Sequence, residues 1–262
     1  SLASAIGKLY AGYFLLFRGF GKVKESIELS SALTEVQNVV DTTFGDMSYK
    51  VDDFAKSSIQ QFGMSELAVK QYSSTFQAMG VAMGISNRAI GDANQFLNKQ
   101  TDGYVGLSSS LSDVSLNLTK LTADIASFYN KSQDVVAEDL ASIFTGMVVP
   151  MRKYGLDLTQ ASLKEFALKN GLDANVESMT QAEKTMLRYQ YVLANTTAAQ
   201  GDFAKTADTW ANQVRILKQN FEQLGGTIGG SLINAFKPFL QTLNNVLLAV
   251  NSFAEKVTAA LG

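Results

Sequence analysis

The sequence predicts an all-α protein, and three features of the 262-residue chain indicate it. Its apolar residues recur at steps of three and four, which place them on one face of a helix. The chain contains only two prolines, Pro150 and Pro238, and proline breaks a helix interior because it lacks the amide donor and clashes with the preceding turn. No alternation of apolar and polar residues is long enough for a major sheet, although short strand pairing around residues 156–158 stays open.

Residues 1–24 are expected to form an apolar and basic N-terminal helix. The stretch LYAGYFLLF at residues 9–17 is apolar, but it is shorter than the ~20 residues that a helix needs to span a bilayer. No acidic residue precedes Glu25, while four basic residues do: Lys8, Arg18, Lys22 and Lys24. Two interpretations remain open, a solvated helix flank or a contact with an acidic partner or membrane surface.

Residues 25–200 are expected to form a compact domain of several helices. Apolar residues at helical spacing end at Gly45 and again at Gly63, and glycine commonly terminates a helix. Ser65 is a suitable N-cap for the helix that follows. The Gly- and Ser-rich stretch TDGYVGLSSS at residues 101–110 predicts a loop and a hinge between two subdomains.

The second half of this domain begins with a regular apolar stripe. It steps by three and four residues and predicts one helix, with the stripe formed by Leu111, Val114, Leu118, Leu121, Ile125 and Phe128. Three further helices have hydroxyl side chains that can satisfy a free backbone donor at the first turn: Ser132, Thr159 and Thr180, the last with Glu183 at capping-box spacing.

Residues 201–262 are expected to form an extended amphipathic helical segment with a coiled-coil-like seam. From residue 203 to 228 the apolar residues step by four and three in strict alternation, which gives three heptads: Phe203, Ala207, Trp210, Val214, Leu217, Phe221, Leu224 and Ile228. An a/d stripe permits two interpretations, self-association as a coiled coil or packing of the helix on its own domain.

Four glycines interrupt the end of this stripe: Gly225, Gly226, Gly229 and Gly230. Each glycine in a helix interior costs ~1 kcal/mol relative to alanine. They predict either a hinge or a close approach between helices.

Composition excludes several function classes. The chain has no Cys and no His, which excludes disulfides, thiolate nucleophiles, Ser-His-Asp catalysis and zinc sites built on these residues. No P-loop motif is present, so nothing predicts nucleotide binding. The net charge of -2 disfavours a protein that coats DNA, because phosphate binding needs dense Lys and Arg. We therefore expect a non-enzymatic protein without a cofactor, a metal site or specific nucleic-acid binding.

Four segments together resemble the central domain of phage tail tape measure proteins, also called the phage minor tail protein family. The segments are LTKLTADIASFYN (residues 118–130), VVPMRKYGLDLTQASLKEFALKNGL (148–172), MTQAEKTMLRYQYVL (179–193) and QGDFAKTADTWANQVRILKQNFEQLGG (200–226). Their order and spacing carry the resemblance, which runs from about residue 30 to about residue 247.

The resemblance implies a structural virion protein. Such proteins are long and mostly helical, lie in the lumen of the assembling tail tube or at its tip, set the tail length and leave ahead of the DNA at infection. The implied partners are further copies of the chain in a parallel trimer or hexamer, the tail tube and tail tip proteins and, at infection, the host membrane. Assembly would take place in the host cytoplasm. An alternative is a membrane-active helical protein that perturbs the host envelope or forms a channel in it, which the apolar residues 9–17 and the apolar C-terminal half favour.

Overall fold

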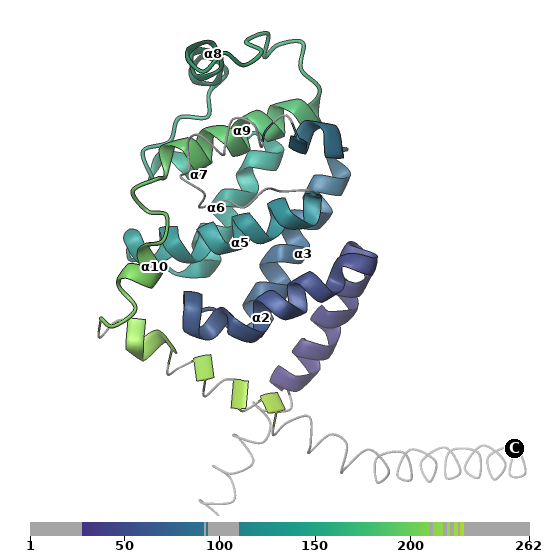
Figure 1. Cartoon of the computed structure of the whole chain (residues 1–262), viewed down its shortest axis with the longest axis vertical. Helices are drawn as coiled ribbons and strands as arrows, with labels where there is room; N and C mark the ends of the chain where they lie inside the picture. Colours follow the sequence, from purple (N-terminus) through teal and green to yellow (C-terminus); the bar gives the residue numbers. More distant parts are fainter. Residues whose placement is uncertain are drawn as a thin grey trace, which may run out of the picture. The chain divides into compact units, whose positions relative to one another are not determined.

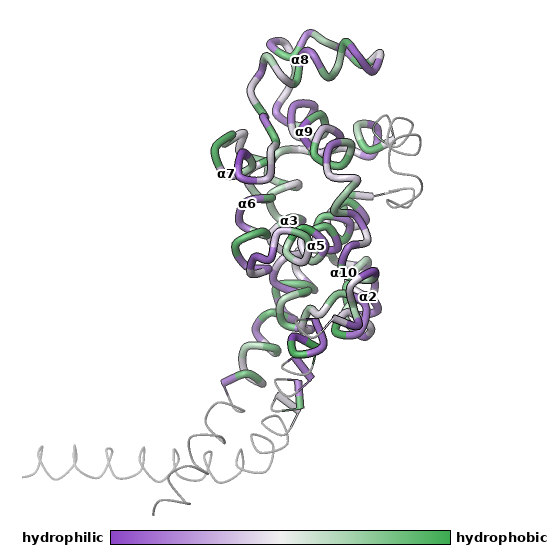
Figure 2. Tube along the Cα trace, turned by 90° about the vertical axis from the view of Figure 1, so that its left-hand side faces the viewer, coloured by the Kyte–Doolittle hydropathy of each residue, from purple (hydrophilic) through white to green (hydrophobic). Residues whose placement is uncertain are grey.

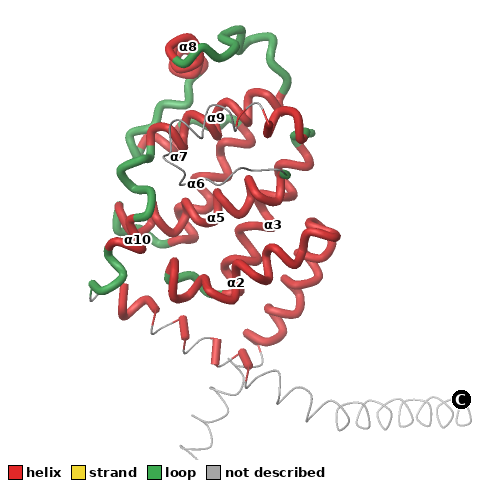
Figure 3. Tube along the Cα trace, in the orientation of Figure 1, coloured by secondary structure: helices red, strands yellow, loops and turns green. Residues whose placement is uncertain are grey.

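A computed structural model describes residues 28–91, 93, 110–209, 212–216, 219–220, 223–224 and 226–227. These residues lie in helices and connecting loops, with no strand among them (Figure 3), so the all-α prediction is confirmed. The chain divides into two compact units, residues 35–220 on the one hand and residues 1–34 with 221–262 on the other. The predicted N-terminal helix, most of the hinge at residues 101–110 and most of the extended C-terminal region lie outside the described residues.

The first half of the described chain follows the stops and starts that the sequence predicts. Residues 28–44 are helical, the short 3-10 helix η1 covers Gly45–Met47, and α2 covers Ser48–Phe62. Helix α2 ends at Gly63, whose φ of 55° is left-handed and therefore suits glycine. The Ser65 side chain accepts a hydrogen bond from the Ala68 amide and starts α3, Glu66–Ala82.

Six helices lie between residues 111 and 205. They are α5 (Leu111–Phe128), α6 (Gln133–Thr145), α7 (Val149–Arg152), α8 (Gln160–Lys169), α9 (Gln181–Asn195) and α10 (Asp202–Lys205). The predicted caps are confirmed, since Ser132, Thr159 and Thr180 each accept a hydrogen bond from the backbone amide three residues later. Ser110 is the described end of the predicted hinge, and it forms a capping box with Asp113 at the start of α5.

Helix α5 lies at the centre of the core. Helices α2, α3, α6 and α10 all pack against it (Figure 1), and its side chains Leu118, Leu121 and Ile125 are fully buried. Apolar and hydrophilic residues follow one another closely along the helices, as expected for amphipathic helices that share a core (Figure 2). At Gly80 of α3 the approach to α5 is so close that a Cβ atom would lie 2.8 Å from Leu111 Cδ2.

Strand pairing around residues 156–158 does not occur. This segment is a loop, and the Leu156 amide donates to the Met151 carbonyl, closing the turn after α7. Leu156 and Leu158 are nevertheless buried, so their apolar character reflects a core contact and not a strand.

Candidate self-association seam

Phe203, the first residue of the predicted seam, is buried inside the domain. It lies in α10 with an exposed fraction of 0% and forms a small apolar cluster with Ile59 of α2 and Ile216. Its ring fills the space beside Gly63, where a Cβ atom would lie 2.7 Å from the ring. At this position the described structure has the seam residue packed on its own domain.

The described residues at the start of the predicted seam do not form one uninterrupted helix. Helix α10 ends at Lys205, residues 206–209 form turns, and residues 212–216 are helical again. Thr209 is the physical reason, because its hydroxyl accepts a hydrogen bond from the Asn212 amide at 3.4 Å and so caps a new helix. The Thr209 amide donates to the Thr206 carbonyl at 3.0 Å, which closes the turn between the two helices.

The remaining seam residues fall into two groups. Ala207 is half-buried in the turn, whereas Val214 and Leu224 are 44% and 55% exposed. The others lie outside the described residues: Trp210, Leu217, Phe221 and Ile228.

Only one of the four predicted hinge glycines is described, since Gly225, Gly229 and Gly230 lie outside the described residues. Gly226 is buried, and a Cβ atom there would lie 3.0 Å from Leu33 Cδ1 and 3.3 Å from Leu29 Cγ. This geometry corresponds to the close approach between helices that the sequence leaves open for these glycines.

Asp124 of α5 anchors the start of α10. Its side chain is almost completely buried, with 1% exposed. One carboxylate oxygen accepts a hydrogen bond from the Gly201 amide at 2.9 Å, and the other accepts one from the Phe203 amide at 3.1 Å. Amides at a helix N-terminus have no partner within the helix, so this carboxylate satisfies donors that would otherwise be unpaired in the interior.

A polar network continues from Asp124 along α5. The hydroxyls of Ser127 and Thr206 lie 3.2 Å apart. The buried Asn212 amide group donates to the Thr206 hydroxyl at 2.9 Å, to the Thr206 carbonyl at 3.1 Å and to the Ser127 hydroxyl at 3.4 Å. The end of α5 is thereby tied to both sides of the turn.

This junction was not predicted from the sequence, although one signal for it is present. Asp124 is the only charged residue in LTADIASF, residues 121–128, and a charged residue in an otherwise uncharged helix end is expected to have a specific partner. The partners themselves lie 77 and 79 residues away in the sequence, where local spacing gives no information.

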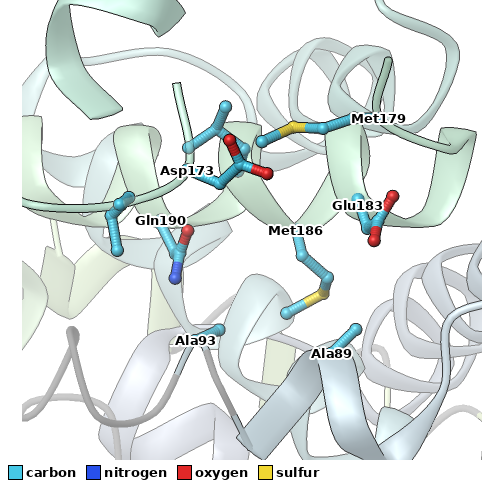
Figure 4. A pocket seen from close by; sticks show the side chains of 9 residues that line it. Ala89, Ala93, Asp173, Met179, Glu183, Met186 and Gln190 are labelled. Atoms are coloured by element: carbon cyan, nitrogen blue, oxygen red, sulfur yellow. The ribbon is translucent and has the colours of Figure 1, made fainter. Parts of the chain in front are cut away.

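Two pockets lie away from the seam. The first has a volume of about 150 Å³ and is lined by Ala89, Ala93, Met186, Glu183 and neighbouring residues. Met186 points toward Ala89 and Ala93 (Figure 4). The Glu183 carboxylate already serves as the capping partner of Thr180.

The second pocket, of about 180 Å³, lies between α3 and α6 and is lined by Tyr72, Phe76, Asp134 and Glu138 among others. The Tyr72 hydroxyl donates to Asp134 at 2.5 Å. Burial is the main cause of the raised pKa of Tyr72, and this hydrogen bond adds to it. The phenol therefore stays protonated and serves as a structural donor to Asp134.

The described residues lack the features of two other kinds of site. They contain no group of three or more acidic, His or Cys side chains arranged to hold a metal ion. They also contain no helix with the length and apolarity needed to cross a bilayer. The apolar residues 9–17 and the chain from residue 228 onward lie outside the described part of the chain.

The comparisons with known proteins add no support to the sequence resemblance, which rests on its four segments. No protein-family model, no curated protein and no solved structure matches the chain.

Proposed function

We propose that the chain is a structural segment of a phage tail tape measure protein, which sets tail tube length during assembly and leaves the tail ahead of the DNA. The observation that carries the proposal is the ordered resemblance of four segments across most of the chain. These segments contain the second half of α5, all of α7 and α8, most of α9, and α10 with the residues after it. Helix α10 packs on α5 and α8 packs on α9, so the resemblance covers elements in mutual contact.

Exposed seam residues support self-association. Val214 and Leu224 are large apolar residues with exposed fractions of 44% and 55%, and both lie at a/d positions of the predicted heptads. Copies related by an axis along the tail tube would cover such residues with the equivalent residues of their neighbours. We therefore propose a parallel trimer or hexamer.

The buried carboxylates support a structural role. Asp124 binds two backbone amides. Asp139 accepts a hydrogen bond from the Tyr154 hydroxyl at 2.5 Å and pairs with Lys153 at 2.6 Å. Both carboxylates bind partners that hold the fold together. We therefore propose no catalytic step, cofactor or specific nucleic-acid ligand for this chain.

The proposed location is the virion, in the tail tube lumen or at the tail tip, after assembly in the host cytoplasm. The compact unit of residues 35–220 is unlike a simple rod, so we place it at one end of the tail. The partners there are the tail tube and tail tip proteins, with contact to the host membrane at infection.

A length measurement on virions tests this proposal. Deletion of residues 231–251 from the chain within its parent gene keeps the heptad phase and removes three heptads. Because a helix advances ~1.5 Å per residue, we expect tails ~30 Å shorter on average in electron micrographs. Virions that lack peptides of this chain in mass spectrometry, or tails of unchanged length, would contradict the proposal.

A further inference from the structure

We propose that residues 201–209 and 212–216, the strap, alternate between two mutually exclusive arrangements. In one they are folded onto α5 and α2, and in the other they are released as the first turns of a continuous seam helix shared with other copies of the chain. This inference rests on the self-association proposed above. It adds that the complete seam can form only after the strap is released.

Phe203 cannot serve both arrangements at once. In the folded strap its ring contacts Ile59 and Ile216 and fills the space beside Gly63. In a coiled coil the same side chain would be the first knob, inserted between four residues of a neighbouring helix. A seam that begins at Phe203 therefore requires this residue to leave its position in the domain.

The sequence is compatible with both arrangements. The alternation of four- and three-residue steps includes Phe203 and Ala207 only if the helix runs through residues 206–209, where the structure has turns. These four residues, TADT, contain no glycine and no proline. Residues 206–209 therefore lack the two residue types that most strongly disfavour a helix. The turn in this segment depends instead on the polar contacts of Thr206 and Thr209.

The strap is attached separately from the main core. Ile59, Phe203 and Ile216 form an apolar cluster of their own, whereas α5, α6 and α9 share the large core cluster. Parts of a protein with few core contacts open with a smaller free energy than global unfolding requires. Release of the strap would therefore remove the small cluster and leave the large one in place.

Hydrogen bonds from α5 hold the strap closed. The Asp124 carboxylate accepts the Gly201 and Phe203 amides, and the Ser127 hydroxyl contacts Thr206 and Asn212. These contacts exist only while the strap lies on α5. They are polar, so Asp124 and Ser127 can exchange them for water when the strap leaves. This latch sets the balance between the two arrangements.

A reversible disulfide tests whether release is required. The hydroxyls of Ser127 and Thr206 lie 3.2 Å apart and the chain has no cysteine of its own, so Ser127→Cys with Thr206→Cys permits one intramolecular bond. By sedimentation equilibrium of the full chain we expect the reduced double variant to self-associate and the oxidised one to do so at least ~10-fold more weakly. The two single-Cys variants under the same conditions are the controls for oxidation.

A second variant opens the latch instead of locking it. In Asp124→Asn one acceptor becomes an NH₂ donor that faces a backbone amide. We expect amide hydrogen exchange in the strap to rise at least ~10-fold while exchange in α6 is unchanged, and self-association to become stronger. Asp53→Asn is the matched control, because this side chain is 65% exposed on α2 and pairs only with Lys56 among the described residues.

The outcomes separate the switch from the seam. Equal self-association of the oxidised and reduced double variant would overturn the switch and leave the seam intact. Faster exchange throughout α5 and α6 in Asp124→Asn would also overturn it, because the strap would then not open separately. A chain that is monomeric in every form would overturn the proposed seam, and the switch with it.

Discussion

The backbone amide of Phe203 donates a 3.1 Å hydrogen bond to the Asp124 carboxylate, joining α10 to α5 across 79 residues of sequence. Burial lowers the pKa of Lys120, one helical turn before Asp124, and the charge of Asp124 opposes that shift. The anchor thus lies in a partly desolvated region of α5, where hydrogen bonds to a charged group contribute more than they do in water. The anchor also lies where the predicted seam begins, because Phe203 is both a residue that Asp124 binds and the first residue of that seam.

The close approach of α3 to α5 predicts a steric effect at Gly80. A Cβ atom there would lie 2.8 Å from Leu111 Cδ2 and 3.1 Å from Leu111 Cγ. We expect Gly80→Ala to lower the free energy of unfolding by ~1–3 kcal/mol in urea denaturation, as overpacking does. Residues 87–91 are helical, and a Cβ atom at Gly91 meets nothing within 4 Å. Gly91→Ala is therefore the control, because alanine favours a helix and meets no steric obstacle there. Equal losses in both variants would contradict the steric explanation.

Replacing the buried carboxylate of Asp139 is expected to change both the stability of the fold and the pKa of Tyr154. This carboxylate accepts the Tyr154 hydroxyl and pairs with Lys153. Burial raises the pKa of Tyr154 above its ordinary value, and the hydrogen bond to Asp139 raises it further. We expect Asp139→Asn to cost ~1–3 kcal/mol in urea denaturation and to move the pKa of Tyr154 downward in a phenolate absorbance titration. A Tyr154 pKa that stays unchanged would show that the Asp139 contact does not act on the phenol.

The capping box of α9 predicts a pH dependence below the ordinary pKa of glutamate. The Thr180 amide donates to the Glu183 carboxylate at 2.7 Å, and this bond lowers the pKa of Glu183 from 4.5. A lowered folded-state pKa stabilises the fold above 4.5, and this contribution is lost as the pH falls through the folded value. We expect the stability difference between the wild type and Glu183→Gln to be constant near neutral pH and to shrink below pH 4.5.

Urea denaturation of the wild type and of Glu183→Gln, once at neutral pH and once below pH 4.5, measures this stability difference. Glu165→Gln is the control, because its side chain is exposed on α8 and no capping contact is involved. A difference for Glu183→Gln that is the same at both pH values would exclude the capping carboxylate as the source.

Local features of the fold could be predicted from the sequence because they depend on residues three or four positions apart. Gly63 ends α2 through its own backbone conformation. Thr180 and Glu183 satisfy each other's backbone donors within a single turn. Such contacts are encoded in short spacings, and the predicted helix boundaries near them agree with the structure.

The junction could not be predicted because its contacts are distant in sequence and polar. The heptad count treats Phe203 and Val214 as residues of one helix, whereas the Thr209 cap begins a new helix between them. Periodicity records where apolar residues fall, but a side-chain cap competes for the same backbone amides without changing that pattern. The burial of Phe203 depends on Ile59, a partner that lies far earlier in the sequence.

A leakage assay separates the proposed structural function from the membrane-active alternative. The probe is a set of phosphatidylethanolamine and phosphatidylglycerol vesicles that contain a self-quenched dye. A chain that acts only as a tail scaffold should release no dye, because its apolar seam is covered by other copies of the chain. Release that grows with protein concentration would favour the membrane-active alternative.

The molecular mass of the full chain in solution tests the proposed seam most directly. Sedimentation equilibrium across the accessible concentration range should give a concentration-dependent rise from 28.3 kDa toward a trimer or hexamer. Leu217→Asp should weaken this assembly, because a charge would be placed in a buried apolar seam. Asn220→Asp adds the same charge outside the seam and should leave assembly unchanged. A single 28.3 kDa species at every concentration, or an unchanged oligomer in Leu217→Asp, would contradict the seam.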